Sequence, residues 1–145
     1  MAESKSEKVL KKLHDVLTAG LSGVTVKRNE AVPLKIPAAG LVILRDGDPG
    51  EADFIHSPPT WLYEHRAEVE VFVDLASASA RDSTFDGIKT KIAEALANNR
   101  TLDGLVDYAV GEAPAPLELS AEGAPGIKAA AIIVLLPYDT SDPLA

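Results

Sequence analysis

The chain has 145 residues, enough for one domain with one hydrophobic core, because a chain of about 150 residues buries nearly 70% of its unfolded surface. The hydrophobic fraction of 46% and the charged fraction of 25% are those of a globular protein and exclude a disordered or fibrous chain. The net charge of −8 argues against general nucleic-acid binding, and the absence of cysteine excludes disulfides and thiolate chemistry. We therefore expect a single domain over residues 1–145.

The N-terminal segment predicts an amphipathic helix that begins at Ser4. Ser4 and Glu7 have the spacing of a capping box, and Glu7 can also pair with Lys11 one turn later. Gly20 and Gly23 are expected to end the helix. The apolar residues recur on one helical face: Val9, Leu10, Leu13, Val16, Leu17 and Leu21. The segment lacks the apolar stretch of a signal peptide, so we expect no secretion by that route.

Two short strands are predicted next, over residues 24–28 and 40–45. A connection that contains prolines, residues 31–39, separates them. Every residue of the run DGDPGE (46–51) is common in turns, so we expect an acidic, exposed loop there.

Residues 61–75 predict a long strand that is buried on one face. Trp61, Tyr63 and the alternate residues after them are mostly apolar, whereas their neighbours are charged. At about 3.3 Å per residue the strand would reach roughly 50 Å, which exceeds the width of a domain of this length. It is therefore expected to bend, carry a bulge or project as a hairpin arm whose backbone edge needs a partner.

The C-terminal half predicts one more helix and two more strands. The helix follows Asp82 and Ser83 and ends near residues 98–99. A strand within 105–119 is interrupted by two prolines and so belongs at the margin of the sheet. The strand over 127–138 is apolar at successive positions, which is typical of a strand covered on both faces.

We therefore predict an α+β fold, with a mostly antiparallel sheet and two helices packed on one of its faces. The expected order is α-β-β-β-α-β-β, with a long strand or hairpin arm. Helices can cover only one face of the last strand, so its second cover has to come from the arm or from another subunit. The longest apolar run, 129–136, is too short to span a bilayer as a helix, and we expect no membrane partner.

The sequence shows no arrangement typical of catalysis or cofactor binding. His14, His56 and His65 have no predicted partner, and neither a nucleophile elbow nor a phosphate-binding glycine motif occurs. A metal site is disfavoured because on a strand His65 points away from its acidic neighbours, and the acidic loop lacks the calcium-binding pattern. We expect no enzymatic activity, no metal and no cofactor. The residues weighed for metal binding are Asp46, Asp48, Glu51, Glu64, His65, Glu68 and Glu70.

Four stretches resemble the tail terminators, a family of small tail completion proteins. The stretches are SEKVLKKLHDVL, IPAAGLVILRDGDPGE, YEHRAEVEV and LLPYDTSDPLA. Similar chains occur in long-tailed phages, prophages and the phage-like gene transfer agents of alphaproteobacteria. The resemblance covers nearly the whole chain.

The resemblance implies a ring, typically a homohexamer, on the head-proximal end of the tail tube. Such a ring stops polymerisation of the tube protein and contacts the head-side connector or stopper, while DNA passes through the lumen without specific binding. It would assemble in the bacterial cytoplasm and become part of the particle. By exposure and charge, we expect subunit or tube contacts at Arg45, Asp46, Asp48, Glu51, Glu64, Arg66, Glu68 and Glu70. The alternatives are a stopper ring on the connector side and, from another class, a small acyltransferase-like enzyme.

Overall fold

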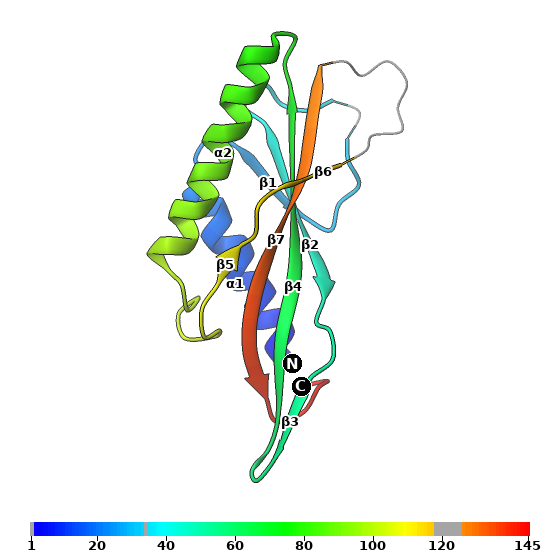
Figure 1. Ribbon diagram of the computed structural model, residues 1–145, viewed down its shortest axis with the longest axis vertical. Helices are drawn as coiled ribbons and strands as arrows, with labels where there is room; N and C mark the ends of the chain where they lie inside the picture. The colour runs from blue at the N-terminus through cyan, green and yellow to red at the C-terminus, as the bar shows by residue number, and fades with distance from the viewer. Residues whose placement is uncertain (1, 34, 118–125) are drawn as a thin grey trace.

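The computed structural model describes residues 2–33, 35–117 and 126–145 and shows an α+β fold (Figure 1). The predicted fold class is confirmed, and both helices lie on one face of the sheet. The elements of the described residues are α1 (Lys5–Gly20), β1 (Thr25–Arg28), β2 (Leu41–Asp48), β3 (Asp53–His56), β4 (Pro59–Asp74), α2 (Ala78–Asn98), β5 (Val110–Gly111), β6 (Ala115–Pro116) and β7 (Ile127–Thr140).

The sheet is built around the pair formed by β4 and β7. These two strands run antiparallel from the pair Trp61 and Thr140 to the pair Asp74 and Ile127. The main strand order is β1-β2-β4-β7-β5; only β1 and β2 run parallel among the described pairings. β3 extends the sheet beside β4, and β6 pairs with β7.

The strand count differs from the predicted order at two places. β3 falls between the second and third predicted strands and was not predicted. The single strand predicted within 105–119 is two strands of two residues each, β5 and β6, at the margin of the sheet as expected. Residues 118–119 of that prediction lie outside the described residues.

The start of α1 is confirmed, but the role predicted for Glu7 is wrong. The Glu7 backbone N–H donates to the Ser4 hydroxyl over 3.2 Å, as a capping residue requires. The Glu7 carboxylate, however, accepts hydrogen bonds from Arg28 of β1, and Lys11 pairs with Glu3. The cation that pairs with Glu7 is therefore Arg28 of β1, which passes beside the first helical turn. The spacing of residues within the helix could not predict this partner.

α2 begins about one and a half turns earlier than predicted. Ser77, rather than Asp82 or Ser83, is the capping residue, and its hydroxyl accepts a hydrogen bond from the Ala80 N–H. Asp82 pairs instead with Lys128 of β7. The predicted apolar stripe of this helix is buried: Phe85, Ile88, Ile92 and Leu96 belong to the main core, and Ala95 lies against Gly20 of α1.

The second face of the sheet is partly covered by the chain itself. Ile36, from the connection between β1 and β2, packs on Leu41, Ile43 and Phe72 in a small second core. The expectation that the second cover of the last strand comes only from the arm or from another subunit is therefore wrong for the start of β7, where Ile127 and Ala129 pack against this core. Among the described residues, β7 contributes only Ile127 and Ala129 to this second core.

Candidate assembly interface

The loop predicted over residues 46–51 is partly wrong, because Asp46, Gly47 and Asp48 still belong to β2, whereas Arg45 lies in the strand as predicted. The register of β2 against β4 shifts between Arg45 and Asp48, which marks a β-bulge. Gly47 lies in the bulge with φ +70°. A bulge contains the same residue types as a turn. The composition of residues 46–51 therefore predicted that the chain changes direction, but it could not show that the strand continues. Glu51 lies in the exposed connection after β2.

Most of the charged side chains predicted to bind partners already have partners within the chain. Arg45 pairs with Glu70 over 2.8 Å, and Arg66 pairs with Glu112 over 2.9 Å. The Asp48 carboxylate accepts from the Gly50 N–H. Within the described ranges, no ion pair is made by Glu51, Glu64 or Glu68. Asp48 makes no ion pair there either, so these four carboxylates carry the unneutralised charge of this region.

Asp46 has a structural role in a network centred on Arg28. The Arg28 guanidinium donates two hydrogen bonds to Glu7, of 2.8 and 2.9 Å, and donates to Asp46 from Nε over 3.0 Å. This arrangement raises the pKa of Arg28, chiefly through Glu7, and lowers the pKa of Glu7 below its usual value. It joins the start of α1 to β1 and to the bulge of β2.

The middle of the sheet's second face, which we call the open face, has a partly exposed apolar strip beside charged residues. Alternate residues of β7 point to the helices and are buried there, whereas those between them are only half-buried. Each half-buried residue lies opposite a charged residue of β4. The pairs are Ala131 with Glu70, Ile133 with Glu68, Leu135 with Arg66, and Pro137 with Glu64.

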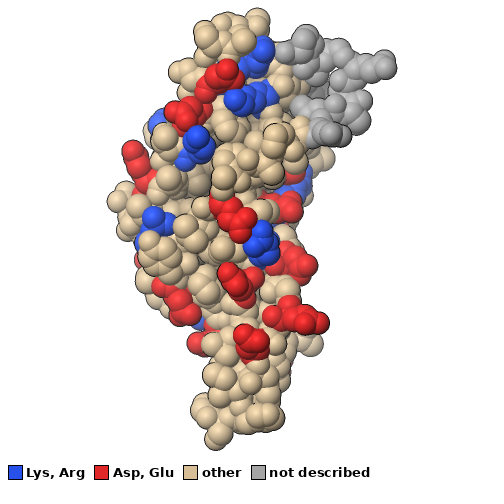
Figure 2. Space-filling model, in the orientation of Figure 1, with Lys and Arg blue, Asp and Glu red and all other residues tan. Residues whose placement is uncertain are grey.

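A hairpin, residues 53–62, projects beyond the helices and is called the arm (Figure 1). It consists of β3 and the first residues of β4, and its end carries no charged side chains in Figure 2. Phe54 lies 4.7 Å from both His56 and Trp61, measured between ring centroids. Phe54 is 42% exposed and Ile55 is 48% exposed.

The structure confirms that the long strand projects as a hairpin arm. Its backbone partners, however, lie in the same chain. β3 pairs with β4 on one side, and β7 follows it to Trp61 on the other. The backbone edge of β4 therefore needs no external partner. The exposed apolar side chains of the arm are the part that a partner would cover.

His65, the histidine on the long strand, is buried and hydrogen-bonded through both ring nitrogens. Nε2 lies 2.6 Å from the Asp46 carbonyl oxygen, and Nδ1 lies 2.8 Å from the Tyr138 hydroxyl. A carbonyl only accepts, so Nε2 carries the hydrogen and Tyr138 donates to Nδ1. His14 is half-buried and His56 is exposed. In the part of the chain that the structure describes, no group of three His, Asp or Glu residues could hold a metal ion.

Replacing Tyr138 by phenylalanine is expected to lower the free energy of unfolding by about 1 to 2 kcal/mol, because it leaves the buried Nδ1 of His65 without a donor. Urea denaturation measures this change. Tyr108→Phe is the matched control, since Tyr108 is 54% exposed and should change stability little. Equal effects of the two substitutions would contradict the structural role of the buried hydroxyl.

The same variant should also change the dependence of stability on alkaline pH. Burial raises the pKa of Tyr138 from 10.0 to about 12. Between these values the unfolded chain releases the phenolic proton while the folded chain keeps it, so the free energy of unfolding falls as pH rises. The difference in stability between the wild type and Tyr138→Phe should therefore shrink over this range.

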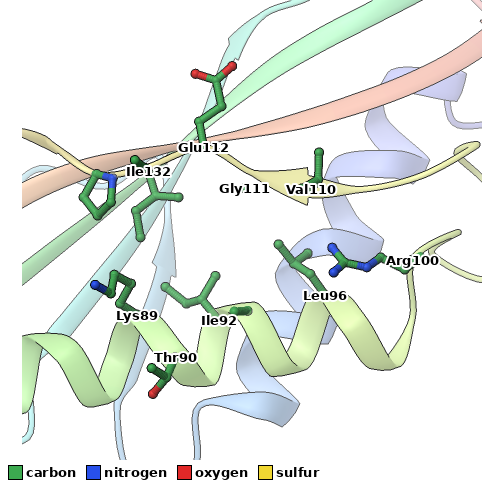
Figure 3. Close-up of a pocket in the computed structure, with 12 residues that line it drawn as sticks. Lys89, Thr90, Ile92, Leu96, Arg100, Val110, Gly111, Glu112 and Ile132 are labelled. Atoms are coloured by element: carbon green, nitrogen blue, oxygen red, sulfur yellow. The ribbon is translucent and has the colours of Figure 1, made fainter.

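A cavity of about 420 Å³ lies between α2 and the segment that contains β5 (Figure 3). Figure 3 shows Ile92 and Leu96 pointing from α2 towards β5 and Ile132. Its lining is mostly apolar, with charged groups only from Lys89, Arg100 and Glu112. Glu112 is held by Arg66, and Arg100 donates to the Ala109 carbonyl over 2.8 Å. This composition suits an apolar ligand or side chain.

No protein-family model matches the chain, and no curated protein matches it. Among solved structures, it is similar to the sheath/tube terminator of an extracellular contractile injection system, PVC, in the extended state. The sequence identity is 13% and the TM-score is 0.42. The match covers 98% of this chain and 59% of the other, so the chain spans less than two thirds of that protein's length. No helix in the described ranges is long and apolar enough to cross a membrane.

Sequence reasoning missed β3 and the cavity. A signal for β3 was present, because the apolar pair Phe54 and Ile55 precedes the Ser57-Pro58 turn and the long strand, which is the pattern of a hairpin. The cavity had no such signal. Its walls come from α2, β7 and the segment of β5, which are far apart in sequence.

Proposed function

We propose that this protein is a tail terminator, a structural protein that forms a ring on the head-proximal end of a phage or gene-transfer-agent tail tube. The ring, typically six-fold, would stop tube polymerisation and join the tube to the head-side connector. The resemblance of the four sequence stretches supports this family. Those stretches correspond to α1, the segment that ends in β2 and its bulge, the middle of β4, and the C-terminal end of β7.

The observation that carries the proposal is the incomplete burial of β7. Ile133 and Leu135 remain half-buried on the open face, although their neighbours on the helical face are fully buried. The uncharged end of the arm adds a second apolar surface. Contiguous apolar surface with a polar rim is typical of protein–protein interfaces. A chain that assembles with copies of itself and with a tube would cover both surfaces.

The charge of the chain is compatible with a channel through which DNA passes. The net charge is −8, so a ring of such chains would be acidic overall. An acidic wall repels the phosphate backbone and so keeps DNA from adhering. The proposal places assembly in the bacterial cytoplasm, with the finished ring as part of the particle.

Our proposal assigns no catalytic role to the chain. His65 uses both ring nitrogens in structural hydrogen bonds, and His56 lies among the aromatic residues of the arm. Among the described residues that line the cavity there is no histidine and no serine, and Thr90 donates its hydroxyl hydrogen to the Gly87 carbonyl oxygen over 3.0 Å. These observations favour a structural protein over the acyltransferase-like alternative, which needs a nucleophile beside a base.

Adding the purified protein to growing tail-tube subunits of the same particle tests the proposal. A terminator should bind one end of each tube and stop elongation, which electron microscopy measures as a shorter length distribution and density at one end. Serum albumin at the same concentration is the control. Unchanged tube growth would contradict the proposal, and binding to connector rings but not to tubes would favour the stopper alternative.

A further inference from the structure

We propose that the arm of one copy inserts its aromatic face into the cavity between α2 and the β5 segment of a second copy. The inference rests on the proposed function, in which copies of the chain assemble with one another, and it specifies which two surfaces form the contact between copies. It takes the second copy as the occupant of the cavity.

The aromatic face of the arm continues the apolar face that the helices cover elsewhere. Trp61 follows the alternation of Tyr63, His65 and Ala67, and Phe54 lies directly opposite Trp61. The covering helix α1 begins at Lys5, beside Tyr63. From Tyr63 to the start of β4 the strand extends four residues, about 13 Å, beyond this cover. The helix layer therefore ends before the apolar face does.

The cavity has the size and the lining to receive this face. Its volume of about 420 Å³ lies in the range of pockets that bind small molecules, and it can accept an aromatic side chain. Ile92, Leu96 and Ile132 form apolar walls. Burial of the Phe54 ring, which is 42% exposed, would remove apolar surface from water chiefly on the arm, because Ile92, Leu96 and Ile132 are already buried beneath the cavity.

The charges of the two surfaces are complementary. Residues 49–62 contain Glu51 and Asp53 but neither lysine nor arginine. The cavity carries Lys89 and Arg100, and its one carboxylate, Glu112, is paired with Arg66. The existing partner of Lys89 is Asp86, an exposed neighbour whose ion pair is weak and readily exchanged. Lys89 can therefore pair with an acidic residue of the arm.

The two surfaces differ, so the contact joins copies head to tail. Such a heterologous contact leaves one arm and one cavity unused at the ends of any open oligomer. Closure into a ring satisfies both. The contact therefore produces the type of assembly that the proposed function requires.

Trp61 provides the test, because it is the only tryptophan of the chain and lies on the arm. We would record its emission and the native mass of the full-length protein over a wide concentration range. The expected result is a blue shift of the emission that accompanies an increase in mass. Phe54→Ser should weaken association at least about tenfold. Val32→Ser is its matched control, since Val32 is 43% exposed and lies outside the arm.

A second pair of variants tests the cavity. Ala93 is exposed on α2 and lines the cavity, so Ala93→Phe should occupy the space and abolish association. Ala97→Phe, one turn later on the same helix and outside the lining, should associate like the wild type. Circular dichroism confirms that each variant is folded.

Three outcomes would overturn the inference. Association with unchanged Trp61 emission, or normal association of folded Ala93→Phe, would show that another surface joins the copies while leaving the terminator role intact. A strictly monomeric chain at all concentrations would also overturn it. Failure to limit tube growth by a chain that associates through the arm would instead contradict the proposed function alone.

Discussion

Replacing Gly47 by alanine should lower the free energy of unfolding by about 3 kcal/mol or more, because the substitution combines backbone strain with a steric clash. Gly47 has φ +70°, a conformation that L-residues rarely adopt. A Cβ atom there would lie 1.9 Å from the Arg66 carbonyl oxygen and 2.9 Å from the Ala67 Cα. Both atoms belong to the backbone of the central strand β4, so the bulge would have to move.

Gly50→Ala is the matched control for Gly47→Ala. Gly50 has φ +71°, but a Cβ atom added there meets no heavy atom within 4 Å. Gly50→Ala should lower the free energy of unfolding by only about 1 kcal/mol, because it introduces backbone strain without a steric clash. Chemical denaturation of both variants separates strain from clash. Equal losses would show that the close approach of β2 to β4 does not contribute to stability.

The disturbance at Gly47 should reach its neighbours. Asp46 contacts His65 through its carbonyl oxygen and Arg28 through its carboxylate, and both contacts depend on the shape of the bulge. Gly47→Ala should therefore also reduce protection of the β2 amides from hydrogen exchange.

Replacing Leu135 by aspartate should abolish limitation of tube growth while the chain stays folded. Leu135 is half-buried on the open face, opposite Arg66, so the carboxylate can remain solvated in the free protein. In an assembly that covers this face, the same carboxylate would be desolvated, and its cross-strand neighbour Arg66 already pairs with Glu112, so its burial should cost several kcal/mol. Tube length by electron microscopy measures the loss, and circular dichroism checks the fold.

Leu144→Asp serves as the control for Leu135→Asp. Leu144 is 90% exposed near the C-terminus, so the same change of chemistry there should leave tube limitation intact. If Leu135→Asp limits tube growth as the wild type does, the open face is not covered in the assembly. The proposed function would then lose the observation that carries it.

The sequence by itself determined the elements whose signals are local. Ser4 and the apolar stripe of α1 predict that helix correctly, since capping and a helical repeat involve residues at most a few positions apart. The alternation from Trp61 predicts β4, and the length of the strand predicts a bend, a bulge or a projecting arm, of which the structure shows the arm. The apolar run of β7 predicts a strand that is covered on both faces. In the structure, its residues on the open face are only half-buried.

Only the tertiary structure decided which residues meet. Turn-type composition at 46–51 does not distinguish a loop from a bulge, and the bulge forms because β2 continues its pairing with β4. Arg28 joins Glu7 and Asp46 across separations of 21 and 18 residues, and Arg66 reaches Glu112 across 46. Such contacts depend on strand order and register, which no short window of sequence specifies. The cavity has the same origin, since its walls meet only when α2 packs beside β5 and β7.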